Sequence, residues 1–271
     1  MTQAGMVEQA EWNGLLSRRA AHADVELLEV LQRSAQGTSG TFRARASDGR
    51  FYWTKVLNNP QGERAVIADQ LVGRVGLLID APVCHVVTIQ VPRSMHGQSV
   101  APGVDLQAGI AHGSLEVPGR VLDIETLSHG TDDSNAERQA AYVALYDWCF
   151  GGDVQGLIAV DEGNRFFSHD HGWFLPGGAN WTSELALEVL NEGHEYPSPG
   201  TYLSSEALDA TARRLETLDR QRLVDALLAI PASWPVPNRE LEELGFFLEH
   251  RAPAVADRLR ALASRLTSHA T

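Results

Sequence analysis

The first third of the chain alternates between apolar and polar positions in short runs that predict β-strands. These runs cover residues 25–31, 41–46 and 51–57, and a period of two is typical of strands with one buried face. A loop of small residues with Gly37 and Gly40 follows the first run. An Asp-Gly pair, which is a strong hairpin signal, separates the second run from the third. We therefore expect an antiparallel meander.

Helical spacing follows the third run. Asn59 is expected to cap the helix, with Pro60 at its first position and Glu63 in its first turn, where the helix dipole favours an acid. Apolar residues then recur at three- and four-residue spacing as far as Ile79, which predicts one buried face. A further strand is predicted over residues 85–91.

The second half of the chain has mainly helical periodicity. A helix is predicted from about residue 135, and a short strand pair is predicted at 157–160 and 165–167. The tail is rich in leucine and arginine. It contains three helix-length segments, which include residues 241–250 and 253–266.

This order of elements predicts an α+β fold in two lobes. We expect a leader over residues 1–24 and an N-lobe of an antiparallel sheet plus one helix over residues 25–127. A mostly helical C-lobe with catalytic-type loops is expected over residues 128–271.

Composition limits the classes of function. With 271 residues, of which 44% are hydrophobic and 21% charged, the chain has the composition of an ordinary globular protein. A net charge of -13 opposes binding to phosphate backbones, so nucleic acid is not an expected partner. Cys84 and Cys149 lie far apart and predict free thiols in a reducing compartment. The sequence shows no signal-peptide pattern and no apolar stretch of spanning length, so we expect no membrane partner and a cytoplasmic location.

Lys55 is the only lysine in a chain that has 22 lysine and arginine residues. It lies among apolar neighbours in the third predicted strand. A compact ammonium, in place of a planar guanidinium, suits the binding of phosphate. The alternative is that an arginine-rich chain keeps one surface lysine whose stem covers apolar surface.

Four features then stand in a fixed order along the chain: the two-glycine loop, the strand lysine, an acid-bearing helix, and two aspartates that flank a short hairpin. Protein-kinase-like phosphotransferases arrange their parts in this order. The chain resembles the HipA-like kinases in particular, and among them the short members, over roughly residues 25–200. The segments that carry the resemblance are 52–55, 58–62, 81–83, 102–104, 146–153 and 168–174.

The resemblance implies a bilobal protein-kinase-like fold and ATP- and Mg²⁺-dependent phosphoryl transfer to a hydroxyl, which in the best-known relatives belongs to a protein serine. Gly37 and Gly40 would form the loop near the nucleotide, and Lys55 would neutralise its phosphates. Asp69 is the first choice to orient Lys55, because it lies beside the apolar helix face, and Glu63 is the second. Aspartate is shorter than the glutamate usual at this place, so the pairing requires a close approach of the helix.

Two later aspartates are candidates for the chemistry. Asp153 follows two glycines and would accept the hydroxyl proton or position the acceptor, whereas its alternative role is to cap a tight turn. Asp170 offers a hard oxygen ligand for Mg²⁺, and its alternative is again a turn aspartate. His169 and His171 flank it, but strand alternation would put both on one face with Asp170 opposite. No third ligand is spaced nearby, so zinc is disfavoured.

Two positions depart from the family pattern. Gly151 stands where relatives commonly have asparagine, and Ile158 stands where kinases generally offer an asparagine to a second magnesium. Gln155 is the substitute candidate for that metal ligand. Two other interpretations therefore stay open: a catalytically impaired pseudokinase that binds a nucleotide or a protein partner, and a kinase whose acceptor is a small molecule.

Overall fold

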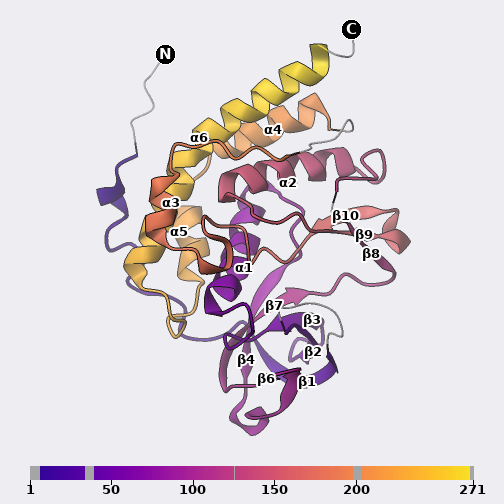
Figure 1. The fold of residues 1–271 in the computed structure, drawn as a ribbon, viewed down its shortest axis with the longest axis vertical. Helices are drawn as coiled ribbons and strands as arrows, with labels where there is room; N and C mark the ends of the chain where they lie inside the picture. The colour runs from indigo at the N-terminus through magenta and orange to yellow at the C-terminus, as the bar shows by residue number, and fades with distance from the viewer. Residues whose placement is uncertain (1–6, 34–39, 125, 198–202, 269–271) are drawn as a thin grey trace.

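The computed structural model describes residues 7–33, 40–124, 126–197 and 203–268, which form an α+β protein (Figure 1). Gly37 lies outside these residues. The strands are β1 (Val25–Arg33), β2 (Phe42–Ala46), β3 (Phe51–Lys55), β4 (Val86–Val91), β5 (Ser99–Ala101), β6 (Val104–Asp105), β7 (Gly109–Leu115), β8 (Val121–Ile124), β9 (Gly156–Ala159) and β10 (Arg165–Ser168). The helices are α1 (Glu63–Gly76), α2 (Asn135–Cys149), α3 (Ser183–Glu188), α4 (Ser205–Glu216), α5 (Arg220–Leu228) and α6 (Asn238–Ser268).

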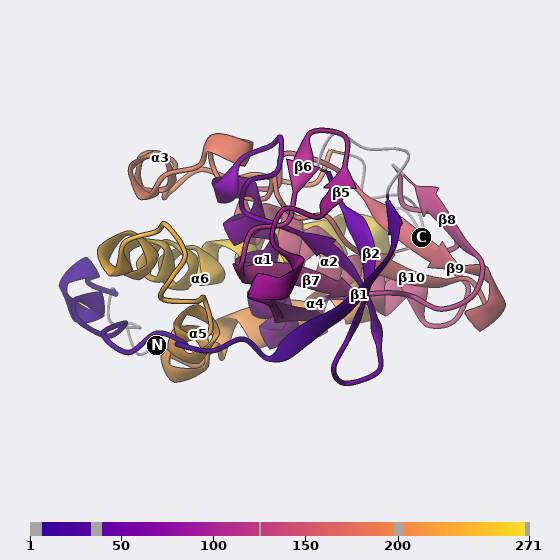
Figure 2. The same cartoon turned by 90° about the horizontal axis from the view of Figure 1, so that it is seen from below.

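The N-terminal strands form a closed barrel in the order β1-β2-β3-β7-β4. Strands β1, β2 and β3 are the antiparallel meander that the sequence predicted. The barrel closes where β4 pairs with β1 in parallel, with Val25 opposite Ile89, so the predicted antiparallel sheet is corrected to a barrel with a parallel junction. Closure pairs strand edges that an open sheet would expose, and Leu27 and Phe42 help to fill the interior. Figure 2 views the molecule from the barrel end.

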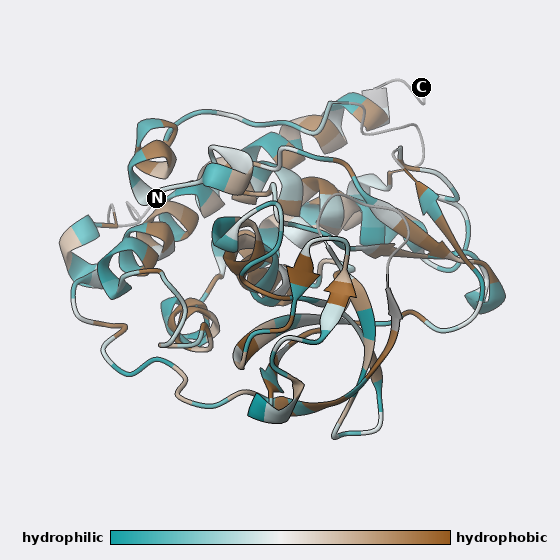
Figure 3. Ribbon diagram, turned by 60° about the horizontal axis from the view of Figure 1, so that its bottom comes forward, coloured by the Kyte–Doolittle hydropathy of each residue, from teal (hydrophilic) through white to brown (hydrophobic). Residues whose placement is uncertain are grey.

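Helix α1 packs between the barrel and the C-terminal helices. It begins at Glu63 and not at Pro60 as predicted, because Asn59 closes a local turn and does not cap the helix. The Asn59 Oδ1 accepts from Gln61 N at 2.8 Å, and its Nδ2 donates to the Gly62 carbonyl at 3.2 Å. This is an Asx turn, to which asparagine is well suited. In Figure 3 the hydrophobic residues lie mainly on the barrel strands and the inner helices.

Helix α6 continues through Pro253. The sequence predicted two separate segments, because an internal proline removes a helical hydrogen bond and costs about 3 kcal/mol. Packing outweighs that cost. Arg251, two residues before Pro253, is fully buried and donates to the carbonyls of Trp148, Asp147 and Glu192. The prediction of two helices here was therefore wrong.

The segment predicted as a leader packs on the C-terminal helices. Trp12 is fully buried, and its Nε1 donates to Glu249 of α6 at 2.8 Å. The Arg19 guanidinium donates to the carbonyls of Ile230, Pro231 and Val236. These contacts connect the start of the described chain to α6 and to the loop between α5 and α6.

A three-stranded sheet in the order β10-β9-β8 lies beside α2 (Figure 1). Strand β8, which lies within the predicted N-lobe range, pairs with β9, with Leu122 opposite Ile158. Because β8 follows β7 after only a short connection, this sheet is held close to the barrel. None of the helices in the described ranges has the length and apolarity needed to cross a membrane.

Candidate active site

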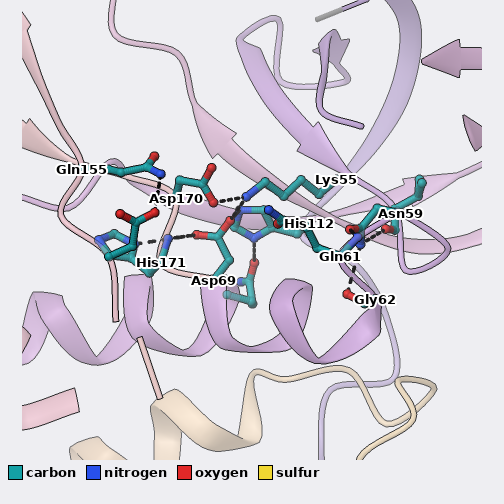
Figure 4. A network of polar contacts seen from close by, with 12 residues as sticks. Lys55, Asn59, Gln61, Gly62, Asp69, His112, Gln155, Asp170 and His171 are labelled. Atoms are coloured by element: carbon teal, nitrogen blue, oxygen red, sulfur yellow. Dashed lines mark hydrogen bonds and ion pairs between the residues drawn. The ribbon is translucent and has the colours of Figure 1, made fainter. Parts of the chain in front are cut away.

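Lys55 ends strand β3 and is only 5% exposed. Its Nζ lies 2.8 Å from Asp69 Oδ2 on α1 and 2.5 Å from Asp170 Oδ1 after β10 (Figure 4). Burial alone would lower the pKa of Lys55, but the attraction of the two carboxylates outweighs it and raises that pKa. The lysine is therefore a fixed, buried cation and not a surface residue.

Asp69 is the acid of α1 that meets Lys55, whereas Glu63 is exposed in the first turn. Although burial alone would raise the pKa of the Asp69 carboxyl, the charge of Lys55 holds it well below its usual value. The close approach that an aspartate requires is present. A Cβ on Gly73, one turn further along α1, would lie 2.6 Å from Val86 Cγ1 of β4.

Asp170 lies in a turn, because β10 ends at Ser168 and Asp170 has a φ of +53°. The predicted strand alternation around it is therefore wrong. The turn is tied to α1 through the backbone N–H of His171, which donates to Asp69 Oδ1 at 2.9 Å. The His171 ring lies 2.6 Å from Ser168 Oγ and is buried. These two contacts of His171 fix the turn, and the turn orients the Asp170 side chain toward Lys55.

One cavity contains this cluster, and a second cavity adjoins the first. One, of about 340 Å³, is lined by Trp53, Lys55, Asp69 and Asp170 among others. The second is a more open cleft of about 600 Å³ lined by Asp153, Gln155 and their neighbours. Asp123 and His169 line both cavities. The structure thus brings Lys55, Asp69 and Asp170 into contact and places Asp153 and Gln155 in the adjoining space.

Asp153 belongs to a loop that satisfies its carboxylate locally. Its Oδ1 accepts from Val154 N at 2.8 Å, and its Oδ2 accepts from Gln155 Nε2 at 2.7 Å. Ile158 is fully buried in β9. Gly151 is held against an aromatic ring, since a Cβ there would lie 2.6 Å from Tyr146 Cδ2. Both residues are thus enclosed by close packing.

Gly40 lies close to the mouth of the barrel. It has a φ of +61°, and a Cβ on it would lie 2.8 Å from Val104 Cγ2. Both the backbone conformation and the close contact favour glycine at this position. Gly40 is not among the described residues that line the cavity around Lys55.

Sequence reasoning missed two buried residues of the site, His112 and Gln70. His112 lies on β7 directly opposite Lys55 of β3, and its ring nitrogens face Gln70 and Asp69. Strand β7 carries two glycines and a serine and gives little strand signal. Neither residue stands in a motif that would have identified it.

The oxygen donors near Asp170 suit a hard cation that is also coordinated by atoms of a bound substrate. Among the described residues, no cluster of three or more histidine, cysteine or acidic side chains is arranged to hold a metal ion. Magnesium commonly uses one or two carboxylates together with substrate phosphates and water. Asp170, with Gln155 as a second oxygen donor, fits that mode, whereas a dedicated metal cage does not.

Comparison with known proteins supports this picture. Residues 27–151 match the family model described as HipA-like kinase, and no curated protein sequence matches the chain. Among solved structures, the chain is similar to the crystal structure of the Helicobacter pylori proinflammatory kinase CtkA. The identity is 9%, the TM-score is 0.54, and the match covers 91% of this chain and 97% of that one.

The two matches differ in what they show. The likeness to CtkA shows the fold, and the family match ends before Asp153 and Asp170, so these two rest on geometry. Together the matches support a kinase-type phosphotransferase. Residues 27–151 match the HipA-like kinase family model, and this match confirms the resemblance predicted from the motifs in that part of the chain.

Proposed function

We propose that the protein is an ATP- and Mg²⁺-dependent phosphotransferase of the HipA-like kinase type that phosphorylates a serine or threonine hydroxyl of a protein. The observation that carries the proposal is the meeting of Lys55, Asp69 and Asp170, from three separate segments, in one cavity. A preorganised charge at a buried site stabilises developing negative charge far more than it would in water. The barrel and the helical part are, in this proposal, the two lobes.

The nucleotide would lie in the 340 Å³ cavity. Lys55 would neutralise its phosphates, and Asp69 would hold the ammonium in place. Trp53 and Leu115 line the same cavity and offer apolar surface to a base. We assign Gly40 to the loop that faces the phosphates.

Mg²⁺, when bound, would offset the negative charge of the phosphates. Asp170 would be its carboxylate ligand, and Gln155 the additional oxygen donor. The Gln155 amide nitrogen already donates to Asp153, which leaves its oxygen available for a cation. Asp170 is the more accessible carboxylate of the pair around Lys55, with a side chain 25% exposed against 3% for Asp69.

The acceptor hydroxyl would enter through the 600 Å³ cleft. Asp153 lines that cleft and is held by Val154 N and Gln155 Nε2, so its carboxylate has a fixed orientation. A carboxylate held in this way can orient a hydroxyl and accept its proton. Positioning of this kind supplies a large part of the catalysis in phosphoryl transfer.

A regulatory pseudokinase is the second candidate. The observation in its favour is that Ile158 is buried where a second metal ligand would be expected. A nucleotide could then bind without transfer. A kinase of a small molecule is the third candidate, and it shares the nucleotide site with the first.

Thermal unfolding with ATP separates these candidates, because a ligand of the native state raises the melting temperature. We expect ATP to raise it, and to raise it further with Mg²⁺, and we expect phosphate transfer in the same mixture. A shift without transfer favours the pseudokinase. The absence of any shift contradicts every nucleotide-binding candidate.

Lys55→Met tests the assignment of the cation. We expect loss of ATP turnover at a temperature where circular dichroism shows the variant folded. Arg45→Met is the matched control, since Arg45 lies on the neighbouring strand β2 with a side chain 42% exposed. Wild-type turnover in Lys55→Met would contradict the role of Lys55, whereas loss in both variants would point to damage of the barrel.

Labelled ATP and a cell lysate identify the acceptor class. The enzyme is incubated with both, and the label is then followed in proteins and in small molecules. We expect labelled protein serine or threonine that is absent with Lys55→Met. Label confined to small molecules would replace the protein acceptor with a metabolite.

A further inference from the structure

His112 is a fully enclosed polar residue in the wall of the nucleotide cavity. It is 1% exposed on β7, directly opposite Lys55 on β3. Its Nε2 has no hydrogen bond within 3.5 Å among the described residues and faces Asp69 Oδ2 at that distance. A buried ring nitrogen without a hydrogen bond lowers the stability of the fold. The position of Nε2 beside Asp69 therefore suggests a role for this nitrogen.

Gln70, the neighbour of Asp69 on α1, determines which ring nitrogen carries the proton. With its amide nitrogen toward His112, Gln70 donates to His112 Nδ1 at 2.7 Å and to the Val87 carbonyl at 3.2 Å. Its oxygen then accepts from Arg74 Nε at 2.8 Å. The reverse orientation would set the amide nitrogen against the Arg74 guanidinium and the amide oxygen against the Val87 carbonyl. The first orientation is therefore the one that the surroundings require.

This orientation fixes the tautomer of the ring. Because Nδ1 accepts from Gln70, the neutral imidazole carries its proton on Nε2. Nε2 lies 3.5 Å from Asp69 Oδ2, the same oxygen that accepts from Lys55 Nζ. The other oxygen, Oδ1, accepts from His171 N. The Asp69 carboxylate is thus hydrogen-bonded from β3 and from the turn after β10, and the His112 ring faces it from β7.

We infer that His112 is the positioning residue of Asp69: its Nε2–H fixes the carboxylate rotamer that holds Lys55 where the proposed phosphate site needs it. The inference rests on the proposed function and adds to it a residue outside the family motifs. Asp170 also attracts Lys55. If the Asp69 carboxylate is fixed, the Lys55 ammonium stays in place when Asp170 binds another group.

The first test compares two substitutions of His112 in ATP turnover. His112→Leu keeps volume but removes the donor, whereas His112→Gln keeps an amide donor. We expect kcat to fall about 10-fold in His112→Leu, a loss of the size that one polar contact to a charged group contributes, and to fall less in His112→Gln. The KM for ATP should change little, because the charges around the phosphates are unchanged. If His112 served only to fill space, kcat would fall more in His112→Gln than in His112→Leu, and that result would overturn the inference.

A double-mutant cycle with Asp69 makes the test specific. If His112 acts through Asp69, His112→Leu has no further effect on kcat in an Asp69→Asn background. Additive losses would contradict the inference. His85→Leu is the control, since His85 is exposed just before β4, and its kcat should equal that of the wild type.

Nitrogen-15 NMR of the histidine rings tests the geometry without turnover. We expect a neutral Nε2–H tautomer for His112 at pH 7 whose signal moves in Asp69→Asn. An Nδ1–H tautomer, or a His112 signal that is unchanged in Asp69→Asn, would overturn the inference even if the enzyme is active. An inactive wild type with the expected tautomer would overturn the proposed function alone.

Discussion

Replacing Lys55 by methionine leaves two carboxylates facing each other without the cation that holds them. At 2.8 Å, the attraction between Lys55 and Asp69 amounts to about 6 kcal/mol for an effective dielectric constant of about 20. Removing the ammonium from water costs several kcal/mol, which offsets part of this attraction. Asp69 keeps its bond from His171 N. We therefore expect Lys55→Met to lower the free energy of unfolding by about 3–5 kcal/mol at pH 7.

Urea unfolding of five proteins measures this effect: the wild type, Lys55→Met, Asp69→Asn, the double variant and the control Arg45→Met. The midpoint should fall in Lys55→Met with little change in slope. The double variant should recover about 2 kcal/mol, because it leaves no unpaired carboxylate at position 69. Arg45→Met should stay within about 0.5 kcal/mol of the wild type, since its ion pair with Glu29 is exposed. A loss below about 1 kcal/mol in Lys55→Met, or no recovery in the double variant, would refute the buried ion pair.

Three further predictions concern the surroundings of the pair. Burial lowers the pKa of His112 to about 4 from the ordinary 6.5, so the unfolded chain binds a proton that the folded chain does not. This contribution to stability is present above pH 6.5 and is lost as the pH falls toward 4, by about 2 kcal/mol between pH 7 and pH 5. Urea unfolding at both pH values should show a smaller loss in His112→Gln, and an equal loss would contradict the assignment. Gly151→Asn would place a Cβ 2.6 Å from Tyr146 Cδ2. We expect a lower melting temperature and about 1–3 kcal/mol of destabilisation. An unchanged melting temperature would show that the Tyr146 ring moves freely. Gly73→Ala should lower the free energy of unfolding by a similar amount, because its Cβ would lie 2.6 Å from Val86 Cγ1. It should also lower ATP turnover. A variant with wild-type stability and full turnover would contradict the need for close packing of α1 against β4.

Local patterns predicted much of the barrel and of the ion pair. Strands β1 to β3 were predicted from the alternation of apolar and polar residues and from an Asp-Gly turn. Both signals act between residues that are close together in the sequence. Lys55 and Asp69 stood on a predicted strand and a predicted helix that follow each other, so their contact was within reach of sequence reasoning. Their degree of burial was not, because it depends on packing from other parts of the chain.

Long-range contacts account for the rest. Strand β7 has little intrinsic strand preference and exists because β3 and β4 pair with its two edges, so His112 was missed with it. The turn at Asp170 depends on a bond from His171 to Asp69, about a hundred positions earlier in the chain. Pro253 stays inside α6 because Arg251 is fixed by distant carbonyls. In each case the deciding partner lies in another segment of the chain.

The shorter acid at position 69 connects several of these features. Asp69 and Gly73 are one turn apart on α1 and so lie on the same face. At Gly73 the helix comes close enough to β4 that a Cβ would collide with Val86, and this approach lets an aspartate reach Lys55 at 2.8 Å. The same approach encloses the pair and brings the His112 ring to within 3.5 Å of Asp69 Oδ2. A glutamate on a more distant helix would reach the lysine through an additional rotatable bond. The aspartate has less freedom, and the neighbouring histidine on β7 restricts what remains, so close packing and the orientation of the carboxylate have a common structural origin.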